Sequence, residues 1–273
     1  ATPPSVNDAD AVAGGSSSGA AASVAFGLAA AGIGSDTGGS GRIPSCWNDL
    51  VGLKTTSGRV SLKGVVPLAV GFDTVGPLCR TVEDAALVFA ALEGRTAPDL
   101  TGASVEGKRF ARLRTIVEDD LRAEPAAGYE RALAKLTGAG AEIVDLEVPE
   151  VAIPMADAGI LYTGEAWALW GEVIEADPEA MFAPIRERFE SGRSVSAADY
   201  IRAWNRMIAA REAWAKATAG FDAVLCPTAP ILPPNVAKLL EGGDYYVTEN
   251  LLALRNTRVG NVMGTCTLTL PTG

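Results

Sequence analysis

Apolar residues in the first third of the chain come in short runs that are separated by glycine and serine. Residues 20–31 are mostly Ala with Val, Phe and Leu, and they predict a buried helix with the serines of residues 16–18 at its N-cap. A glycine-rich turn is expected over residues 32–41. Thr81 opens an amphipathic run to residue 92 with acidic residues in its first turn, which is the pattern of a capped helix.

The pattern changes in the middle of the chain, where strand-like and helix-like periods alternate. Residues 112–117 predict a strand, residues 124–137 an amphipathic helix that stops at the glycines of residues 138–140, and residues 142–148 a second strand. This order is a βαβ unit. Residues 155–218 contain most of the tryptophans at helical spacing and predict several packed helices.

The last part of the chain carries three shorter signals. Residues 221–225 predict a strand that Pro227 terminates, residues 256–262 a helix, and residues 266–270 a strand that stops at Pro271. The alternation favours an α/β fold with a central mixed β-sheet covered by helices on both faces. We expect residues 1–100 to form a core with two serine loops, and residues 101–273 to complete the same domain, with a helical stretch at about residues 155–220.

Composition narrows the function classes. The chain has 273 residues, 48% hydrophobic and 21% charged, which is enough apolar material for a buried core. Its formal net charge is −10 without any Lys or Arg block, so nucleic acid is not an expected partner. No apolar run is long enough for a bilayer, and the first ten residues lack the features of a signal peptide. A soluble protein is therefore expected.

Cysteine and histidine usage restricts the chemistry further. The four cysteines are far apart and form no C-x-x-C pair, so we expect free thiols in the reducing cytoplasm. The chain contains no histidine. A Ser-His-Asp triad, a Cys-His dyad and the commonest metal ligand are all excluded, and any nucleophile needs another base.

Two Gly-rich turns, residues 14–19 and 34–41, each present a serine and are joined by one helix and a return segment. A helix of about 12 residues spans only ~18 Å, so the return can bring Ser40 beside Ser16. The glycines before Ser40 allow the amides of Thr37, Gly38 and Gly39 to converge on one point as an oxyanion hole. Losing one donor from such a hole costs roughly 3–4 kcal/mol of transition-state stabilisation, and acyl transfer is the chemistry it serves best.

Other interpretations of these loops are weaker. The first loop has the composition of a flexible linker, but it runs directly into an apolar helix. The Asp-Thr-Gly at residue 36 occurs once, whereas aspartic proteases need two such carboxylates. Neither loop ends like a phosphate-binding P-loop. Arg42 and Lys54 are expected to be structural or ion-paired.

At this point the sequence resembles the amidase signature family, the Ser-cisSer-Lys amidohydrolases. The family pairs a GGSS(S/G)G loop with a T-D-T-G-G-S-x-R-x-P loop, which match residues 14–19 and 35–44. The resemblance implies the amidase signature fold, with Ser40 as the nucleophile, Ser16 as the proton relay, a cis Gly15–Ser16 peptide, a neutral lysine as base, and no cofactor or metal. Further matches are VGLKTTSGRVSLKGVVPLA (residues 51–69), DTVGPLCRTVEDAA (73–86), FDAVLCPTAP (221–230) and NTRVGNVMGTCTLTLPTG (256–273).

One departure from the family pattern concerns this lysine. The family places it several dozen residues before the first serine loop, and residues 1–15 contain none. Lys54 and Lys63 belong to a segment that is structural in the family, so neither is assigned as the base. We therefore expect the fold to be incomplete at both ends of this chain, with the catalytic lysine before Ala1.

The resulting hypothesis is an amidohydrolase that cleaves a linear carboxamide through an acyl-enzyme on Ser40. Backbone amides of Asp36, Thr37, Gly38 and Gly39 form the expected oxyanion hole, and Ser17 supports Ser16 or replaces it as relay. The alternatives are an amidase subunit of a tRNA-dependent amidotransferase, an allophanate hydrolase, and an inert fragment or pseudoenzyme without the lysine. The expected partner is a small-molecule amide, with neither nucleic acid nor membrane, and a homodimer is left open.

Overall fold

The computed structural model describes residues 2–272, and its first sheet carries the serine loops. This sheet is antiparallel, with neighbours in the order β1 (Gly32–Ser35), β3 (Val75–Cys79), β2 (Val51–Lys54) and β7 (Thr267–Thr269). All five residues of β3 are buried, as expected for a strand with a neighbour on each side. β1 leads directly into Asp36, so the sheet fixes where the second serine loop starts.

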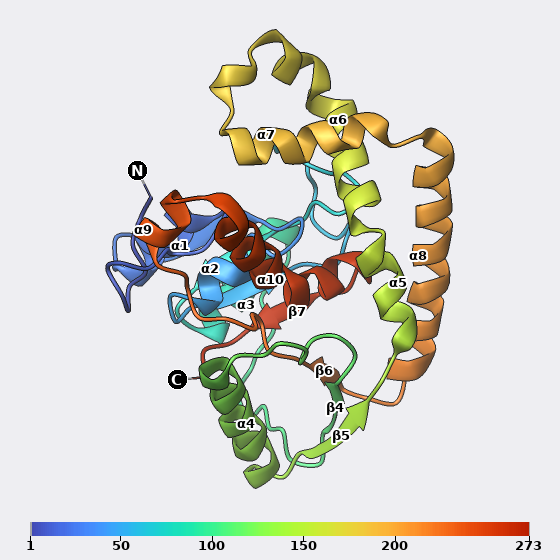
Figure 1. Cartoon of the computed structure of the whole chain (residues 1–273). Helices are drawn as coiled ribbons and strands as arrows, with labels where there is room; N and C mark the ends of the chain where they lie inside the picture. The colour runs from blue at the N-terminus through green and yellow to red at the C-terminus, as the bar shows by residue number, and fades with distance from the viewer. Residues whose placement is uncertain (1, 273) are drawn as a thin grey trace.

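The second sheet is parallel and contains β5 (Glu142–Leu146), β4 (Arg109–Leu113) and β6 (Ala223–Leu225). The crossover between β4 and β5 contains helix α4 (Ala123–Gly138). The predicted βαβ unit is therefore confirmed. Figure 1 shows this sheet and α4 at the lower end of the molecule, away from the N-terminal loops.

The helices enclose both sheets, and three of them are close to the serine loops. α1 (Ser18–Ala25) and α2 (Arg42–Cys46) follow the two loops directly, and α10 (Gly243–Val262) crosses the centre of the view in Figure 1 beside α2. α3 (Val82–Glu93) starts at Thr81, whose side chain accepts a hydrogen bond from the Asp84 amide, as the sequence predicts. The other helices are η1 (Pro149–Val151), α5 (Ala152–Ala156), α6 (Ala158–Ala176), η2 (Pro178–Ala180), α7 (Ala183–Glu190), η3 (Ser191–Ser194), α8 (Ala197–Thr218) and α9 (Val236–Leu240).

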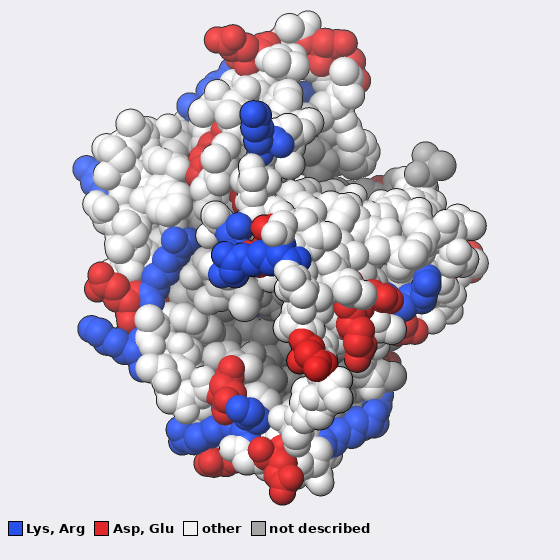
Figure 2. Space-filling model, turned by 180° about the vertical axis from the view of Figure 1, so that it is seen from behind, with Lys and Arg blue, Asp and Glu red and all other residues white. Residues whose placement is uncertain are grey.

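The largest buried cluster lies where α6, α8 and α10 meet the parallel sheet. It includes Phe72, Leu113, Leu161, Met207 and Val262, all nearly or fully inaccessible. This cluster holds α10 in place, and α10 in turn contacts the serine loops. The charged surface is mixed: Figure 2 shows basic side chains across the middle of the rear face and acidic ones at the upper tip, where α6 and α7 lie in Figure 1.

The predicted fold class is confirmed: the protein is α/β, with strands of both directions and helices on both faces. Within residues 2–272 the strands form two sheets instead of one. Several element bounds were wrong: the first helix ends at residue 25, a strand occupies residues 32–35 of the expected turn, and α10 begins at Gly243. Over the same described residues, no helix is both long and apolar enough to span a membrane.

Candidate active site

The two serine loops are in direct contact. The Ser17 amide donates to the Ser40 carbonyl at 3.1 Å, and the Ser17 hydroxyl donates to the Ser35 carbonyl at 3.2 Å. The peptide bond between Gly15 and Ser16 is cis, as the sequence resemblance implies. Ser16 is exposed and Ser40 is half-buried, so both serines lie on adjoining backbone segments at an accessible surface. Within residues 2–272, neither the Ser16 nor the Ser40 hydroxyl makes a hydrogen bond.

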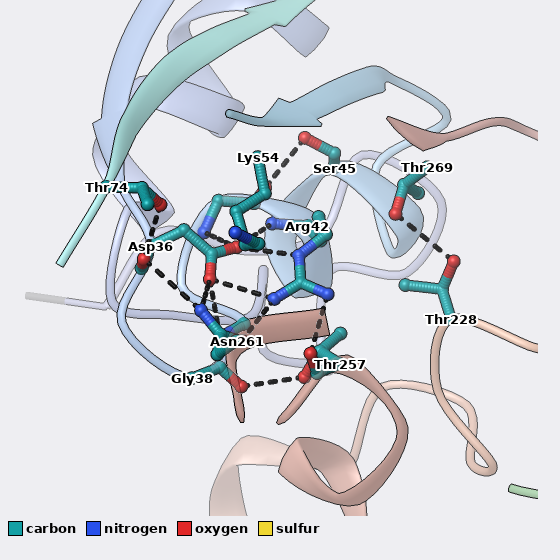
Figure 3. A network of polar contacts seen from close by, with 12 residues as sticks. Asp36, Gly38, Arg42, Ser45, Lys54, Thr74, Thr228, Thr257, Asn261 and Thr269 are labelled. Atoms are coloured by element: carbon teal, nitrogen blue, oxygen red, sulfur yellow. Dashed lines mark hydrogen bonds and ion pairs between the residues drawn. The ribbon is translucent and has the colours of Figure 1, made fainter. Parts of the chain in front are cut away.

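The second serine loop winds around the buried carboxylate of Asp36. This carboxylate accepts hydrogen bonds from the amides of Gly39, Gly41 and Arg42, from the Arg42 guanidinium, and from the Asn261 side-chain amide. Figure 3 shows Arg42 and Asn261 converging on it from α2 and α10. A single carboxylate therefore fixes the backbone on either side of Ser40.

The charge on this carboxylate is stabilised by its partners. Burial by itself would raise the pKa of Asp36, but the positive charge of Arg42 and hydrogen bonds from Arg42 and Asn261 outweigh burial and hold that pKa at about 2. The Arg42 side chain is 1% exposed, and its remaining donors reach the Thr257 carbonyl at 2.7 Å and the Asn261 side-chain oxygen at 2.5 Å. The ion pair is thus buried and fully hydrogen-bonded.

Two of the four expected oxyanion-hole amides are already used within the loop. The Asp36 amide donates to the Thr74 carbonyl at 2.8 Å, and the Gly39 amide donates to the Asp36 carboxylate at 2.9 Å. Both assignments are corrected on this geometry, because these hydrogens point to internal acceptors. Among the described residues, the amides of Thr37, Gly38 and Ser40 have no acceptor.

Helix α10 fixes the shape of the loop from the other side. The Thr257 hydroxyl donates to the Gly38 carbonyl at 2.8 Å. Gly39 has φ +136°, and a Cβ on it would lie 2.2 Å from the Thr257 Oγ1. Only glycine fits here, because a side chain would both strain the backbone and push α10 away. Its role in the loop is steric as well as conformational.

Lys54 lies in the same buried region, as Figure 3 shows. It is 1% exposed, and its ammonium donates to the Thr55 carbonyl at 2.8 Å. Burial, with the positive charge of Arg42, lowers its pKa from 10.5 to about 8 although Asp36 opposes the shift. The expected structural position is consistent with this burial, whereas Lys63 is exposed.

The residues that hold the loop from α10 were not identified as site residues from the sequence. Asn256, Thr257 and Asn261 are buried polar residues of this helix, each with a hydrogen bond to a distant segment. The only available signal was a run of amide and hydroxyl side chains in the NTRVGN segment. Such a run becomes informative once its partners are known.

Comparison with known proteins follows the same two loops. The family model described as Amidase matches residues 4–273. The 2-amino-5-chloromuconic acid deaminase of Comamonas testosteroni is 37% identical over 269 residues, which are 96% of this chain and 57% of that protein. The amidase-related subunit of the glutamyl-tRNA(Gln) amidotransferase from Chlorobaculum tepidum is 39% identical over 177 residues, or 60% of this chain and 37% of that protein.

A solved structure agrees with these sequence matches. The crystal structure of an amidase superposes with a TM-score of 0.87 at 30% identity, covering 98% of this chain and 61% of that one. The chain spans about half the length of the curated relatives it matches.

Proposed function

We propose, because this chain belongs to the amidase signature family, that the protein containing it hydrolyses the C–N bond of a linear carboxamide through an acyl-enzyme. One observation carries the proposal. The serine loops are joined by the 3.1 Å hydrogen bond from the Ser17 amide to the Ser40 carbonyl, and the amides of Thr37 and Gly38 beside Ser40 lack acceptors among the described residues. A half-buried hydroxyl next to free amides suits acyl transfer.

In this proposal the Ser40 hydroxyl attacks the amide carbonyl and its proton passes through Ser16 to the leaving nitrogen. The amides of Thr37, Gly38 and Ser40 hold the oxyanion, and water then releases the acid from the Ser40 ester. The base is the lysine that the family resemblance implies, and residues 1–15 contain none. Ser17 serves as a support, because its hydroxyl binds the Ser35 carbonyl.

A second candidate is an amidase subunit that works within a tRNA-dependent amidotransferase. It is favoured by the relative of that name at 39% identity over 177 residues. The two candidates differ in their requirement for partners. Amide hydrolysis by the purified full-length protein supports the first, and activity that appears only with co-purifying subunits supports the second.

The substrate is proposed to be a small amide, and the location the cytoplasm. All four cysteines are free thiols in the structure, which is the usual state in a reducing compartment. Light scattering on the full-length protein tests for the homodimer that the sequence leaves open.

The test is fluorophosphonate labelling of the full-length protein, with the modified residue mapped by mass spectrometry. We expect the label on Ser40 and its loss in Ser40→Ala, together with a fall of at least about 10³-fold in amide hydrolysis. Ser16→Ala should lower hydrolysis by roughly 10²–10⁴-fold as a lost proton relay. The matched control is Ser23→Ala, whose hydroxyl binds the Gly19 carbonyl within its own helix. Undiminished hydrolysis by Ser40→Ala would sink the assignment.

A further inference from the structure

An arginine of α10, Arg258, lies against the backbone of the second serine loop. It follows Thr257, which binds the Gly38 carbonyl at 2.8 Å. A Cβ built on Gly38 would lie 3.9 Å from the Arg258 Nε. The guanidinium is therefore next to the loop segment that carries the free amides of Thr37 and Gly38.

This arginine has no polar partner in the part of the chain that the structure describes. Arg258 is half-buried, yet residues 2–272 offer it neither a hydrogen bond nor an ion pair, and its one recorded contact is with the Tyr162 ring, whose centroid lies 5.7 Å from the guanidinium carbon. Arg42, which is equally close to the loop, is saturated by Asp36, Thr257 and Asn261. An unpaired, partly desolvated guanidinium is costly and requires an anion from elsewhere.

A second unsatisfied group faces the same place. The Tyr162 hydroxyl is buried and has no hydrogen-bond partner among the described residues. Its ring is held from behind by Phe72, with ring centroids 4.3 Å apart. Tyr162 and Arg258 thus present a hydroxyl donor and a guanidinium donor on neighbouring positions, each rigidly supported and neither satisfied.

The electrostatics of the position favour an anion. Burial and the positive charge of Arg188 lower the pKa of Arg258, although Tyr162 opposes the shift. Arg188 is itself bound to the amide oxygen of Asn250 at 3.1 Å instead of a carboxylate. Two arginines that repel each other beside the serine loop would both be stabilised by a bound negative charge.

We propose that Arg258 and the Tyr162 hydroxyl bind a carboxylate of the substrate, so that the preferred substrates are short amides with a carboxylate a few bonds from the scissile carbonyl. The inference rests on the proposed function and names its substrate class. A carboxylate matches the fork of a guanidinium and accepts a further bond from the tyrosine. The separation is short because Arg258 lies directly beside Gly38, where the carbonyl oxygen would bind.

A different role for Arg258 makes a different prediction. If its guanidinium stabilised the oxyanion itself, removing it would slow every amide equally. If it binds a substrate carboxylate, the loss is confined to amides that carry one. The comparison of charged and neutral substrates therefore separates the two roles.

The experiment measures ammonia release by the full-length protein from malonamate and succinamate, and from the neutral butyramide and valeramide. We expect the carboxylated amides to have the higher kcat/KM. Arg258→Gln should lower kcat/KM for them by about 10–100-fold, mainly through KM, and change the neutral amides less than about 2-fold. Tyr162→Phe should give a smaller loss of the same selectivity. The control is Arg202→Gln on α8, an exposed arginine paired with Asp199.

A binding measurement keeps the test independent of turnover. Malonamate should bind the Ser40→Ala protein by calorimetry, and Arg258→Gln in that background should weaken binding by about 10–100-fold while Arg202→Gln leaves it unchanged. Equal turnover of neutral and carboxylated amides, or an equal loss on both in Arg258→Gln, overturns the inference but leaves amide hydrolysis intact. Failure to hydrolyse any amide, with Ser40 unlabelled, overturns the proposed function instead.

Discussion

Replacing Asp36 with asparagine tests the interpretation that one carboxylate holds the serine loop. The carboxylate accepts from two amides, of Gly39 and Gly41, from Arg42 and from Asn261. Asparagine offers one acceptor oxygen and puts an NH₂ group against the remaining donors. It also leaves the charge of Arg42, a side chain that is 1% exposed, without its counter-ion.

The expected cost follows from the burial of the pair. Removing one partner of a buried ion pair destabilises a protein by roughly 3–5 kcal/mol. At roughly 2–4 °C per kcal/mol for a domain of this size, the melting temperature should fall by about 6–20 °C. Labelling of Ser40 should fall as well, because the loop around it loses its anchor.

The pH dependence gives an independent check on the same group. The folded-state pKa of Asp36, about 2, is below the reference value of 3.8 for the free side chain. Asp36 therefore contributes stability above pH 3.8, and this contribution is lost as the pH falls towards 2. It amounts to about 2 kcal/mol, and Asp36→Asn should lack it.

The assay is denaturant unfolding of the full-length protein at neutral pH and across this acid range. Asp199→Asn is the matched control, because Asp199 pairs with Arg202 while both side chains are more than half exposed, at 52% and 66%. It should cost less than about 1 kcal/mol. The reasoning is refuted if Asp36→Asn costs no more than this control, or if it leaves Ser40 labelling unchanged.

Two further predictions concern Gly39 and Lys54. Gly39→Ala places a Cβ 2.2 Å from the Thr257 Oγ1 at φ +136°, so it should cost more than about 2 kcal/mol and abolish labelling, whereas Gly138→Ala, with nothing within 4 Å, should not; wild-type labelling in Gly39→Ala would contradict this. The pKa of Lys54, about 8, is below 10.5, so wild-type stability should increase as the pH rises from 8 to 10.5. Unfolding titrations of Lys54→Met should lack this increase of at most about 3 kcal/mol, and a retained increase would assign it to another group.

Elements with local sequence signals were predicted well. Thr81 caps α3 because a threonine followed by acidic residues satisfies the first free amides of a helix by itself. α4 runs from Ala123 to Gly138, one residue beyond the prediction at each end, since its amphipathic spacing and terminal glycines lie within the segment. In both cases the information needed is contained in fewer than about 20 residues.

Features that depend on distant partners could not be predicted in this way. The first part of α10 was missed because it buries Glu249, whose carboxylate pairs with Arg122, a residue more than a hundred positions earlier. A buried acidic residue breaks the apolar stripe by which a helix is recognised. Likewise, the Asp36 amide was assigned to the oxyanion hole because its acceptor, the Thr74 carbonyl, comes from another strand.

One turn of α10 serves two ends of the proposed chemistry. Thr257 and Asn261 face Gly38, Arg42 and Asp36, so they fix the loop that carries the free amides. Arg258, between them in sequence, contributes no bond to that loop. Changes at residues 257 and 261 should therefore alter the rate on every amide through the loop, while changes at residue 258 alter the choice among amides. Substrate preference can change at this turn without disturbing the nucleophile, because support and recognition come from different side chains.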